Sequence, residues 1–232
     1  MKRMNLLFSV VTIVAATALC VGCKDKGDAA DKTDAATVAA EEGAAALEAA
    51  DWARAYDKFS DAIAANDQDV DSYYGRAAAA TQIAQGHYSL AKAAATNQNE
   101  EAGIAEAEKA DQYFKLAIED CDRIVAIDQN FADAYFLKGT IAQYQGAWED
   151  GIEAFTQCVK LDPENAEAYH RRGEIYDHTG DYMNSSVDFK KASELGFSEG
   201  LETAEAGSGD LEDFSDLEYD GDDAAAEEVE NN

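Results

Sequence analysis

The sequence predicts an all-α fold, a solenoid of stacked helix pairs, and three observations lead to that prediction. The chain of 232 residues contains one proline and is rich in alanine, and alanine is the best helix former whereas proline is the worst. Hydrophobic residues make up 47% of the chain, which is enough for a packed core. Residues of distinctive chemistry also recur at a 34-residue interval, which is typical of repeat architectures.

The 34-residue interval is clearest over residues 132–165 and 166–199. Shifting one segment onto the other superimposes Tyr135 with Tyr169, Gly139 with Gly173, Gly146 with Gly180, Trp148 with Tyr182, Phe155 with Phe189, and Leu161 with Leu195. The first glycine pair would let two helices approach closely, and the second pair stands in short polar turns. Asp162-Pro163 predicts a helix end, because the residue before proline avoids helical geometry. Each segment is therefore predicted to be a helix, a turn and a second helix.

Two earlier units follow the same plan less clearly. Residues 36–69 place Trp52 seven residues before Phe59, which is also the spacing from Trp148 to Phe155. The first aromatic residue of the unit 70–131 is Tyr73, and its separation from Tyr135 is longer than the 34-residue interval. The excess indicates that this second unit contains a 28-residue insertion, residues 85–112.

The insertion is predicted to form an elongated helix hairpin. Its one clear turn signal, Thr96-Asn97-Gln98-Asn99, lies near the midpoint and is flanked by helical sequence on both sides. Fourteen extra residues in each arm would add about 21 Å to each helix. The alternative is a loose loop, although loops of this length are uncommon in compact domains.

These residues resemble the tetratricopeptide-repeat family, whose pattern combines aromatic residues, a small residue at the helix crossing, a turn and a proline. Residues 132–165 supply Tyr135, Gly139, Trp148, Phe155 and Pro163, and residues 166–199 supply Tyr169, Gly173, Tyr176, Tyr182, Phe189 and Ala192. Gly151 and Ser185 replace the usual alanine, and Phe197 replaces the usual proline. The resemblance implies a right-handed solenoid of about four repeats over residues 36–198, at 36–69, 70–131, 132–165 and 166–199.

The resemblance also implies a binding surface, because in this family the first helix of each repeat lines a concave face that takes a peptide or a partner helix. The residues implied to face inward are Asp71, Tyr74, Ala78 and Thr81, then Asp133, Phe136, Thr140 and Gln143, and then Glu167, His170, Glu174 and Asp177. The candidate partner-binding residues among them are Tyr74, Thr81, Phe136, Thr140, Gln143, His170, Glu174 and Asp177. The alternative for Tyr74 and Phe136 is that they only pack against neighbouring repeats. The acidity of the face predicts a partner with a basic or neutral segment.

The N-terminus has the form of a lipoprotein export signal. Lys2 and Arg3 are followed by an apolar run over 6–19 that is too short for a comfortable transmembrane helix. Gly22-Cys23 then resembles a bacterial lipobox, whose cysteine is acylated, although Cys20 stands where that family usually has leucine. We therefore expect a signal peptide at 1–22, lipidation at Cys23, a flexible tether over 23–35, and attachment to the inner or outer membrane of a bacterial envelope, facing the periplasm or the exterior. An ordinary secretion signal and an uncleaved anchor are the alternatives.

The C-terminal segment 199–232 contains 14 acidic residues and no lysine or arginine, and is predicted to be a disordered acidic tail. It includes a stretch that resembles a calcium-binding EF-hand loop, with Asp216, Glu218, Asp220, Gly221 and Glu227. Only five residues follow Glu227, which leaves no room for the second helix of that motif. A plain acidic tail is the favoured interpretation.

Several functions are not expected. The net charge of −30 argues against nucleic acid, whose phosphates attract lysine and arginine clusters. No catalytic constellation is recognisable, and we predict no enzyme activity and no cofactor. His170, Glu174 and His178 are spaced along one helix, but the two histidines would lie about 12 Å apart and could not share one ion. No metal site is therefore predicted, while a disulfide between Cys121 and Cys158 stays open.

Shape and anchor together predict a non-catalytic, membrane-anchored scaffold or adaptor for protein–protein interaction, bound to the membrane through its lipid only. The alternative is a small-ligand-binding, solute-handling lipoprotein associated with a transporter, in which the hairpin would close over a deep apolar pocket.

Overall fold

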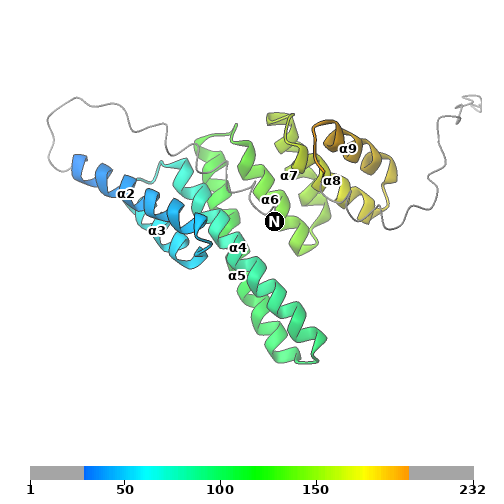
Figure 1. Cartoon of the computed structure of the whole chain (residues 1–232), viewed down its shortest axis with the longest axis horizontal. Helices are drawn as coiled ribbons and strands as arrows, with labels where there is room; N and C mark the ends of the chain where they lie inside the picture. Colours follow the sequence, from blue (N-terminus) through cyan, green and yellow to red (C-terminus); the bar gives the residue numbers. More distant parts are fainter. Residues whose placement is uncertain (1–28, 199–232) are drawn as a thin grey trace, which may run out of the picture. The chain divides into compact units, whose positions relative to one another are not determined.

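The computed structural model describes residues 29–198, and these residues form eight helices and no strand. The predicted signal peptide, the lipidation site at Cys23 and the acidic tail lie outside the described residues. The helices, shown in Figure 1, are α2 (Ala29–Glu48), α3 (Trp52–Ala65), α4 (Val70–Thr96), α5 (Glu100–Ile127), α6 (Ala132–Gln145), α7 (Trp148–Leu161), α8 (Ala166–Thr179) and α9 (Tyr182–Glu194). Each helix packs antiparallel on the next and the pairs stack in chain order, so the predicted all-α solenoid is confirmed.

Helix α2 begins earlier in the chain than the sequence predicts. Helix α2 starts at Ala29, inside the segment 23–35 that was assigned to a flexible tether. The sequence from Ala29 to Ala36 contains four alanines, and alanine favours a helix even where no apolar stripe is present. The helix therefore continues upstream of the region in which hydrophobic periodicity could be recognised.

The insertion forms the predicted hairpin. Helices α4 and α5 contain 27 and 28 residues, whereas α6, α7 and α8 contain 14 each, and in Figure 1 the two long helices extend beyond their neighbours. The turn falls at Asn97–Asn99, where Gln98 has a positive φ of 58° and the Asn99 side chain accepts a hydrogen bond from the Ala102 backbone N–H. At the base of the hairpin, Tyr88 and Phe114 lie against the Tyr144 ring of α6 at 5.6 and 5.8 Å between ring centroids.

Glycines allow the two helices of a repeat to meet at a bulky aromatic ring. A Cβ atom at Gly139 would lie 2.8 Å from the Phe155 ring, and one at Gly173 would lie 2.9 Å from the Phe189 ring. Both rings are separated from their glycine by the same interval, which is why the two pairs superimpose in the sequence. Gly146 and Gly180 end α6 and α8 with φ values of 70° and 82°, a conformation that glycine adopts without strain.

Ion pairs recur at equivalent positions. The Arg76 guanidinium in α4 donates to Asp120 in α5 at 2.8 and 2.6 Å, and Arg172 in α8 donates to Asp188 in α9 at 2.7 and 2.8 Å. The separations along the chain are 44 and 16 residues, and the difference between them is the length of the insertion. Both aspartates are buried, with 5% and 3% of their surface exposed. Two of the repeats therefore share one electrostatic contact.

Both cysteines of the described region are free and buried. Cys121 belongs to a core cluster of α3, α4, α5 and α6, while Cys158 belongs to one of α6, α7 and α8. Burial raises the pKa of both thiols, that of Cys158 to about 12. The two residues therefore serve as small apolar core groups, and the disulfide that the sequence left open is not formed.

Candidate functional site

The first helices of three successive repeats, α4, α6 and α8, lie side by side, since α4 contacts α6 and α6 contacts α8. All eight candidate partner-binding residues are on these three helices. We call their shared surface the A-helix face. Helix α8 is set in place by Asn165, whose side chain accepts a hydrogen bond from the Ala168 backbone N–H at 2.9 Å. This cap fixes the first turn, from which Glu167 and His170 project.

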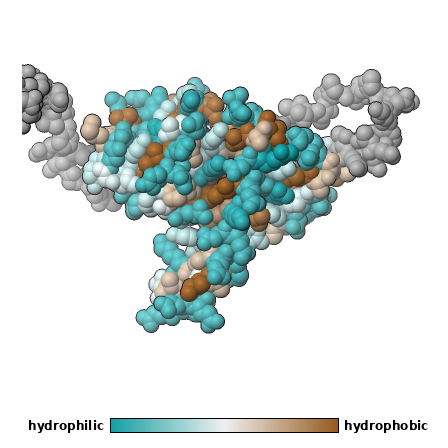
Figure 2. All heavy atoms as spheres, turned by 180° about the vertical axis from the view of Figure 1, so that it is seen from behind, coloured by the Kyte–Doolittle hydropathy of each residue, from teal (hydrophilic) through white to brown (hydrophobic). Residues whose placement is uncertain are grey.

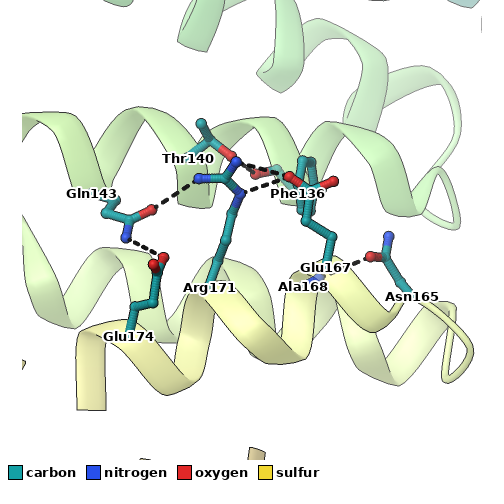
Figure 3. Close-up of polar contacts among 8 residues, drawn as sticks. All are labelled: Phe136, Thr140, Gln143, Asn165, Glu167, Ala168, Arg171 and Glu174. Atoms are coloured by element: carbon teal, nitrogen blue, oxygen red, sulfur yellow. Dashed lines mark hydrogen bonds and ion pairs between the residues drawn. The ribbon is translucent and has the colours of Figure 1, made fainter. Parts of the chain in front are cut away.

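A polar network connects α6 and α8 across the A-helix face, as Figure 3 shows. Arg171 donates to the Glu167 carboxylate through Nε and Nη2 at 2.9 and 2.8 Å, and through Nη1 to the Gln143 side-chain oxygen at 3.5 Å. Gln143 in turn donates to Glu174 at 3.1 Å. The guanidinium carbon of Arg171 lies 5.9 Å from the centre of the Phe136 ring. The structure thus brings Phe136, Gln143 and Glu174 together around one arginine.

Three candidate residues are largely covered by the fold itself. Thr81, Phe136 and Thr140 have 2%, 6% and 6% of their surface exposed. The two threonine hydroxyls donate to the backbone carbonyls one turn earlier, those of Ala77 and Phe136, at 2.8 and 3.1 Å. The Phe136 ring packs edge-on against Phe155 at 5.7 Å and under the Arg171 guanidinium, so for this residue the alternative of packing within the array is the one observed. These side chains offer a partner little surface.

The other five candidates keep accessible surface. Glu174 and Asp177 are exposed, while Tyr74, Gln143 and His170 are half-buried. Tyr74 lies against Phe131 at 5.5 Å between ring centroids, and burial raises its pKa. His170 packs between Phe189 and Phe197 at 5.2 and 4.4 Å between ring centroids, so these two rings cover part of its surface. Partner contact by any of these residues stays a prediction.

Two further inward positions, Asp71 and Asp133, are carboxylates that have no partner among the described residues. Both are half-buried, and neither has a hydrogen bond or an ion pair with any residue of 29–198. Burial raises the pKa of each, and a neighbouring carboxylate adds to the effect, that of Asp69 for Asp71 and that of Asp162 for Asp133. A half-buried carboxylate without a cation is electrostatically unfavourable, so this part of the face attracts positive charge.

Arg171 organises this network but was not among the residues that the sequence predicted. A signal was present, because Glu167 and Arg171 are four residues apart on a predicted helix, and opposite charges at that spacing form ion pairs. His170, Glu174 and His178, which share a helix, were not expected to hold a metal. His178 packs on Trp148 at 4.3 Å, away from His170. Within the described region no three histidine, cysteine or acidic side chains lie close enough to hold a metal ion.

Comparison with known proteins identifies the repeats. Two family models, both described as tetratricopeptide repeat, match residues 132–165 and 154–185. The chain contains tetratricopeptide repeats. Proteins with such repeats generally act as non-catalytic scaffolds for protein interaction.

Solved structures with tetratricopeptide repeats have the same fold. A crystal structure of MamA is 18% identical and covers 86% of this chain and 88% of its own, with a TM-score of 0.55. The tetratricopeptide domain of Arabidopsis OM64 is 22% identical over 63% of this chain and 98% of its own, and the first such domain of human RPAP3 is 18% identical over 66% and 98%, each with a TM-score of 0.50. Identities this low establish the fold alone.

One curated relative is an enzyme, a UDP-N-acetylglucosamine–peptide N-acetylglucosaminyltransferase of Giardia intestinalis. It is 26% identical over 87 residues, which are 38% of this chain but only 6% of that protein. A match to so small a share of the transferase gives no ground for assigning its activity here. No helix within residues 29–198 has the length and hydropathy needed to cross a membrane.

Proposed function

We propose that this protein is a non-catalytic scaffold that binds a partner protein on the A-helix face. The observation that carries the proposal is the run of accessible polar groups along three adjacent first helices, from Asp71 through Asp133 and Gln143 to Glu174 and Asp177. These groups lie on a stiff array, because the aromatic and ion-pair contacts described above fix each helix against its neighbours. A stiff surface loses little conformational entropy when a partner binds.

The expected partner contributes a basic segment. Asp71 and Asp133 have no cation in the described region, and Glu174 and Asp177 add exposed negative charge further along the face. The chain as a whole carries a net charge of −30, which speeds the approach of a cationic partner and repels acidic ones. A lysine or arginine of the partner would relieve the cost of the half-buried carboxylates.

We further propose that the array is attached to a bacterial envelope membrane by a lipid on Cys23. The support is sequence alone: a basic start, a short apolar run and Gly22-Cys23 at its end. The residues between Cys23 and Ala29 would separate the lipid from α2. In this arrangement the lipid holds the scaffold at the membrane while the A-helix face recruits the partner.

The A-helix face is tested by in-cell crosslinking and pull-down of the full-length protein, with mass spectrometry of what is captured. The test variant carries Glu174→Lys and Asp177→Lys, both at exposed positions of α8. The control carries Asp57→Lys and Glu119→Lys, which make the same charge change on the second helices α3 and α5. We expect one protein to be captured by the wild type and by the control but lost from the test variant. Equal capture by both variants would place the contact elsewhere, and capture of no protein would leave the small-ligand alternative to be tested.

The anchor is tested separately with Cys23→Ser. We expect wild-type protein in the membrane fraction to incorporate a labelled fatty acid, and the variant to lose the label and to appear in the soluble fraction. A variant that stays in the membrane without label would indicate an uncleaved apolar leader as the anchor. Since this variant leaves α4, α6 and α8 unchanged, its outcome is independent of the A-helix face.

A further inference from the structure

A cleft with a volume of about 320 Å³ lies over α6, between α5 and α7. Its lining includes Tyr135 and Lys138 of α6, Ile118 of α5, and Asp150, Glu153 and Gln157 of α7. None of the A-helix face residues lines it, because Tyr135 and Lys138 point to a different side of α6 than Phe136, Thr140 and Gln143 do. The cleft is therefore a separate feature on the side formed by the second helices. Figure 2 shows apolar and polar side chains intermixed over the visible surface of the array, without one large apolar patch.

The two flanking repeats have a buried ion pair at the positions equivalent to Lys138 and Ala154 of the cleft. At one, the Arg76 guanidinium is bound by Asp120 and lies 5.7 Å from the centre of the Tyr73 ring. At the other, Arg172 is bound by Asp188 and lies 5.6 Å from the Tyr169 ring. In each case a buried carboxylate and a tyrosine ring hold one guanidinium, which both groups bind favourably.

The middle repeat keeps the tyrosine but lacks the ion pair. The 34-residue shift places Lys138 on Arg172 and Ala154 on Asp188, while Tyr135 falls on Tyr169. Without a carboxylate at residue 154, the Lys138 ammonium instead binds Asp122 of α5 at 2.7 Å. Ala142 lines the cleft where the last repeat has Tyr176, so no large side chain fills the space. The cleft is thus lined by the residues equivalent to those that surround the guanidinium in the last repeat.

The lining supplies acceptors for such a group. Asp150, Glu153 and Gln157 lie within two turns of α7, and none of them has a hydrogen bond or an ion pair with any residue in the described part of the chain. Lys138 and Asp122 neutralise each other, so the two free carboxylates leave the cleft negative. Ile118 is the residue equivalent to Tyr56, whose ring lies 5.8 Å from the Arg76 guanidinium of the following repeat. In the cleft, Ile118 offers an apolar wall for the methylene groups of an arginine.

We propose that this cleft binds an arginine side chain of a partner protein, which takes the place that Arg76 and Arg172 hold within their own repeats. The guanidinium would donate to Asp150 and Glu153 and lie against the Tyr135 ring, and its methylenes would lie along Ile118. The proposal goes beyond the A-helix face, because it adds a second contact surface with its own chemistry. Arginine is expected over lysine, since a planar guanidinium both stacks on an aromatic ring and donates to two acceptors.

The proposal is tested by NMR titration of the full chain carrying Cys23→Ser, with three small probes. N-acetyl-arginine amide is expected to shift the amide signals around Tyr135, Asp150 and Gln157. N-acetyl-citrulline amide has nearly the same shape without the charge, and N-acetyl-lysine amide has a charge without the planar fork. Both are expected to bind at least roughly tenfold more weakly, a difference of about 1.4 kcal/mol. Equal shifts with the arginine and citrulline probes would overturn the proposal.

Two variants locate the binding. Lys138→Arg with Ala154→Asp installs the pair found in the flanking repeats, so it should fill the cleft and abolish the arginine-dependent shifts. Asp150→Asn with Glu153→Gln changes only unpaired acceptors and should weaken binding at least roughly tenfold with the fold intact. Unchanged binding in the second variant would rule out the cleft as the site. A fourth probe is a capped peptide with one internal arginine and no other charged residue. It should bind at least as well as the arginine amide, and failure to bind would exclude a protein as the source of the guanidinium.

Discussion

At the scale of single residues, the fold depends most on the buried ion pairs. Asp188 is 3% exposed and binds Arg172 through two hydrogen bonds, while the same guanidinium donates to Thr156 of the preceding repeat at 2.9 Å. Asp188→Ala would leave a largely buried guanidinium without its carboxylate. We expect a loss of about 3–5 kcal/mol in the free energy of unfolding, measured by urea denaturation. Asp177→Ala, at an exposed position of α8, should change it by less than about 0.5 kcal/mol. If both variants lost the same free energy of unfolding, the Arg172–Asp188 ion pair would not contribute to stability beyond an ordinary surface residue.

Replacing Asp133, which has no hydrogen bond or ion pair within residues 29–198, should have the opposite effect on the free energy of unfolding and stabilise the protein. Its pKa is raised above the ordinary value of 3.8, first by burial and then by the nearby Asp162 carboxylate. The folded state therefore holds this proton more tightly than the unfolded chain does, and stability falls as the pH rises from 3.8 through the raised pKa. Asp133→Asn should accordingly be more stable than the wild type at pH 7, and the difference should vanish near pH 3. Thermal unfolding across this range measures it, and a variant less stable at pH 7 would show that the carboxylate is satisfied in the fold.

If the neutral variant is more stable, the carboxylate is kept at a cost to folding. A cost of this kind is expected where a group serves binding. The same Asp133→Asn variant should then bind the basic partner more weakly, which links the stability measurement to the A-helix face.

At the scale of helices, the closest contacts are those between a glycine and an aromatic ring. In Gly139→Ala the new Cβ would lie 2.8 Å from Phe155, a ring with no exposed surface and therefore little freedom to move. We expect destabilisation by about 1–3 kcal/mol, seen as a lower urea midpoint. Gly86→Ala is the matched control, because a Cβ at that helical position meets nothing within 4 Å. It should stabilise the protein by up to about 1 kcal/mol. If both variants behave alike, close helix approach is not what selects glycine at 139.

The helix pairs were predictable because the residues that make the helix contacts are chemically distinctive. Gly139 and Phe155 touch each other, and so do Gly173 and Phe189, so one contact produced two matched pairs in the sequence. The length of the hairpin followed from the offset of Tyr73. The sequence left the role of Phe136 open between partner contact and packing, because its burial depends on the Phe155 and Arg171 side chains that cover it. The start of α2 was missed because alanine-rich sequence favours a helix without leaving a hydrophobic pattern.

The insertion prevented the two buried ion pairs from being recognised as equivalent in the sequence. Arg172 and Asp188 are 16 residues apart, whereas Arg76 and Asp120 are 44 apart, so no single spacing connects them. Subtracting the 28-residue insertion makes the two pairs equivalent. The same correction shows that Lys138 and Ala154 occupy these positions in the middle repeat, and the cleft could have been expected there. Its acceptors on α7 could not, since their free state depends on the contacts of each side chain.

At the scale of the array, the last helix in the described residues, α9, differs from the equivalent helix of the repeat before it. Helix α7 presents Ile152 and Val159 to the contact with α8, and the 34-residue shift replaces them with Ser186 and Ser193 in α9, where both are exposed. A further repeat would have to pack on these polar positions. Helix α9 is not polar throughout, because Tyr182, Met183 and Val187 are also exposed on it. The two serines therefore weaken the apolar contact that the equivalent positions of α7 make with the next repeat, without making the whole helix surface polar.

The hairpin can be removed by design, because the 34-residue repeat shows which residues of the second unit are the insertion. Deleting residues 85–112 joins Ala84 to Tyr113, which correspond to Gly146 and Ala147 in the turn of the next repeat. Gly146 has a φ of 70°, so Ala84→Gly should accompany the deletion to form that turn without strain. The shortened chain would lose the contact of Tyr88 with Tyr144 but would keep the Arg76–Asp120 pair, now at the same spacing as the ion pair of the last repeat.

We expect the shortened chain to unfold in one cooperative transition, with a circular dichroism signal reduced by the missing helical residues and a somewhat lower melting temperature. A broad transition or a loss of helix beyond the deleted residues would mean that the hairpin is needed to hold α5 against α6. If the chain folds, the crosslinking experiment can be repeated with it. Capture of the same partner would assign recognition to the A-helix face alone, whereas loss of capture in a folded variant would make the hairpin part of the surface that the partner contacts.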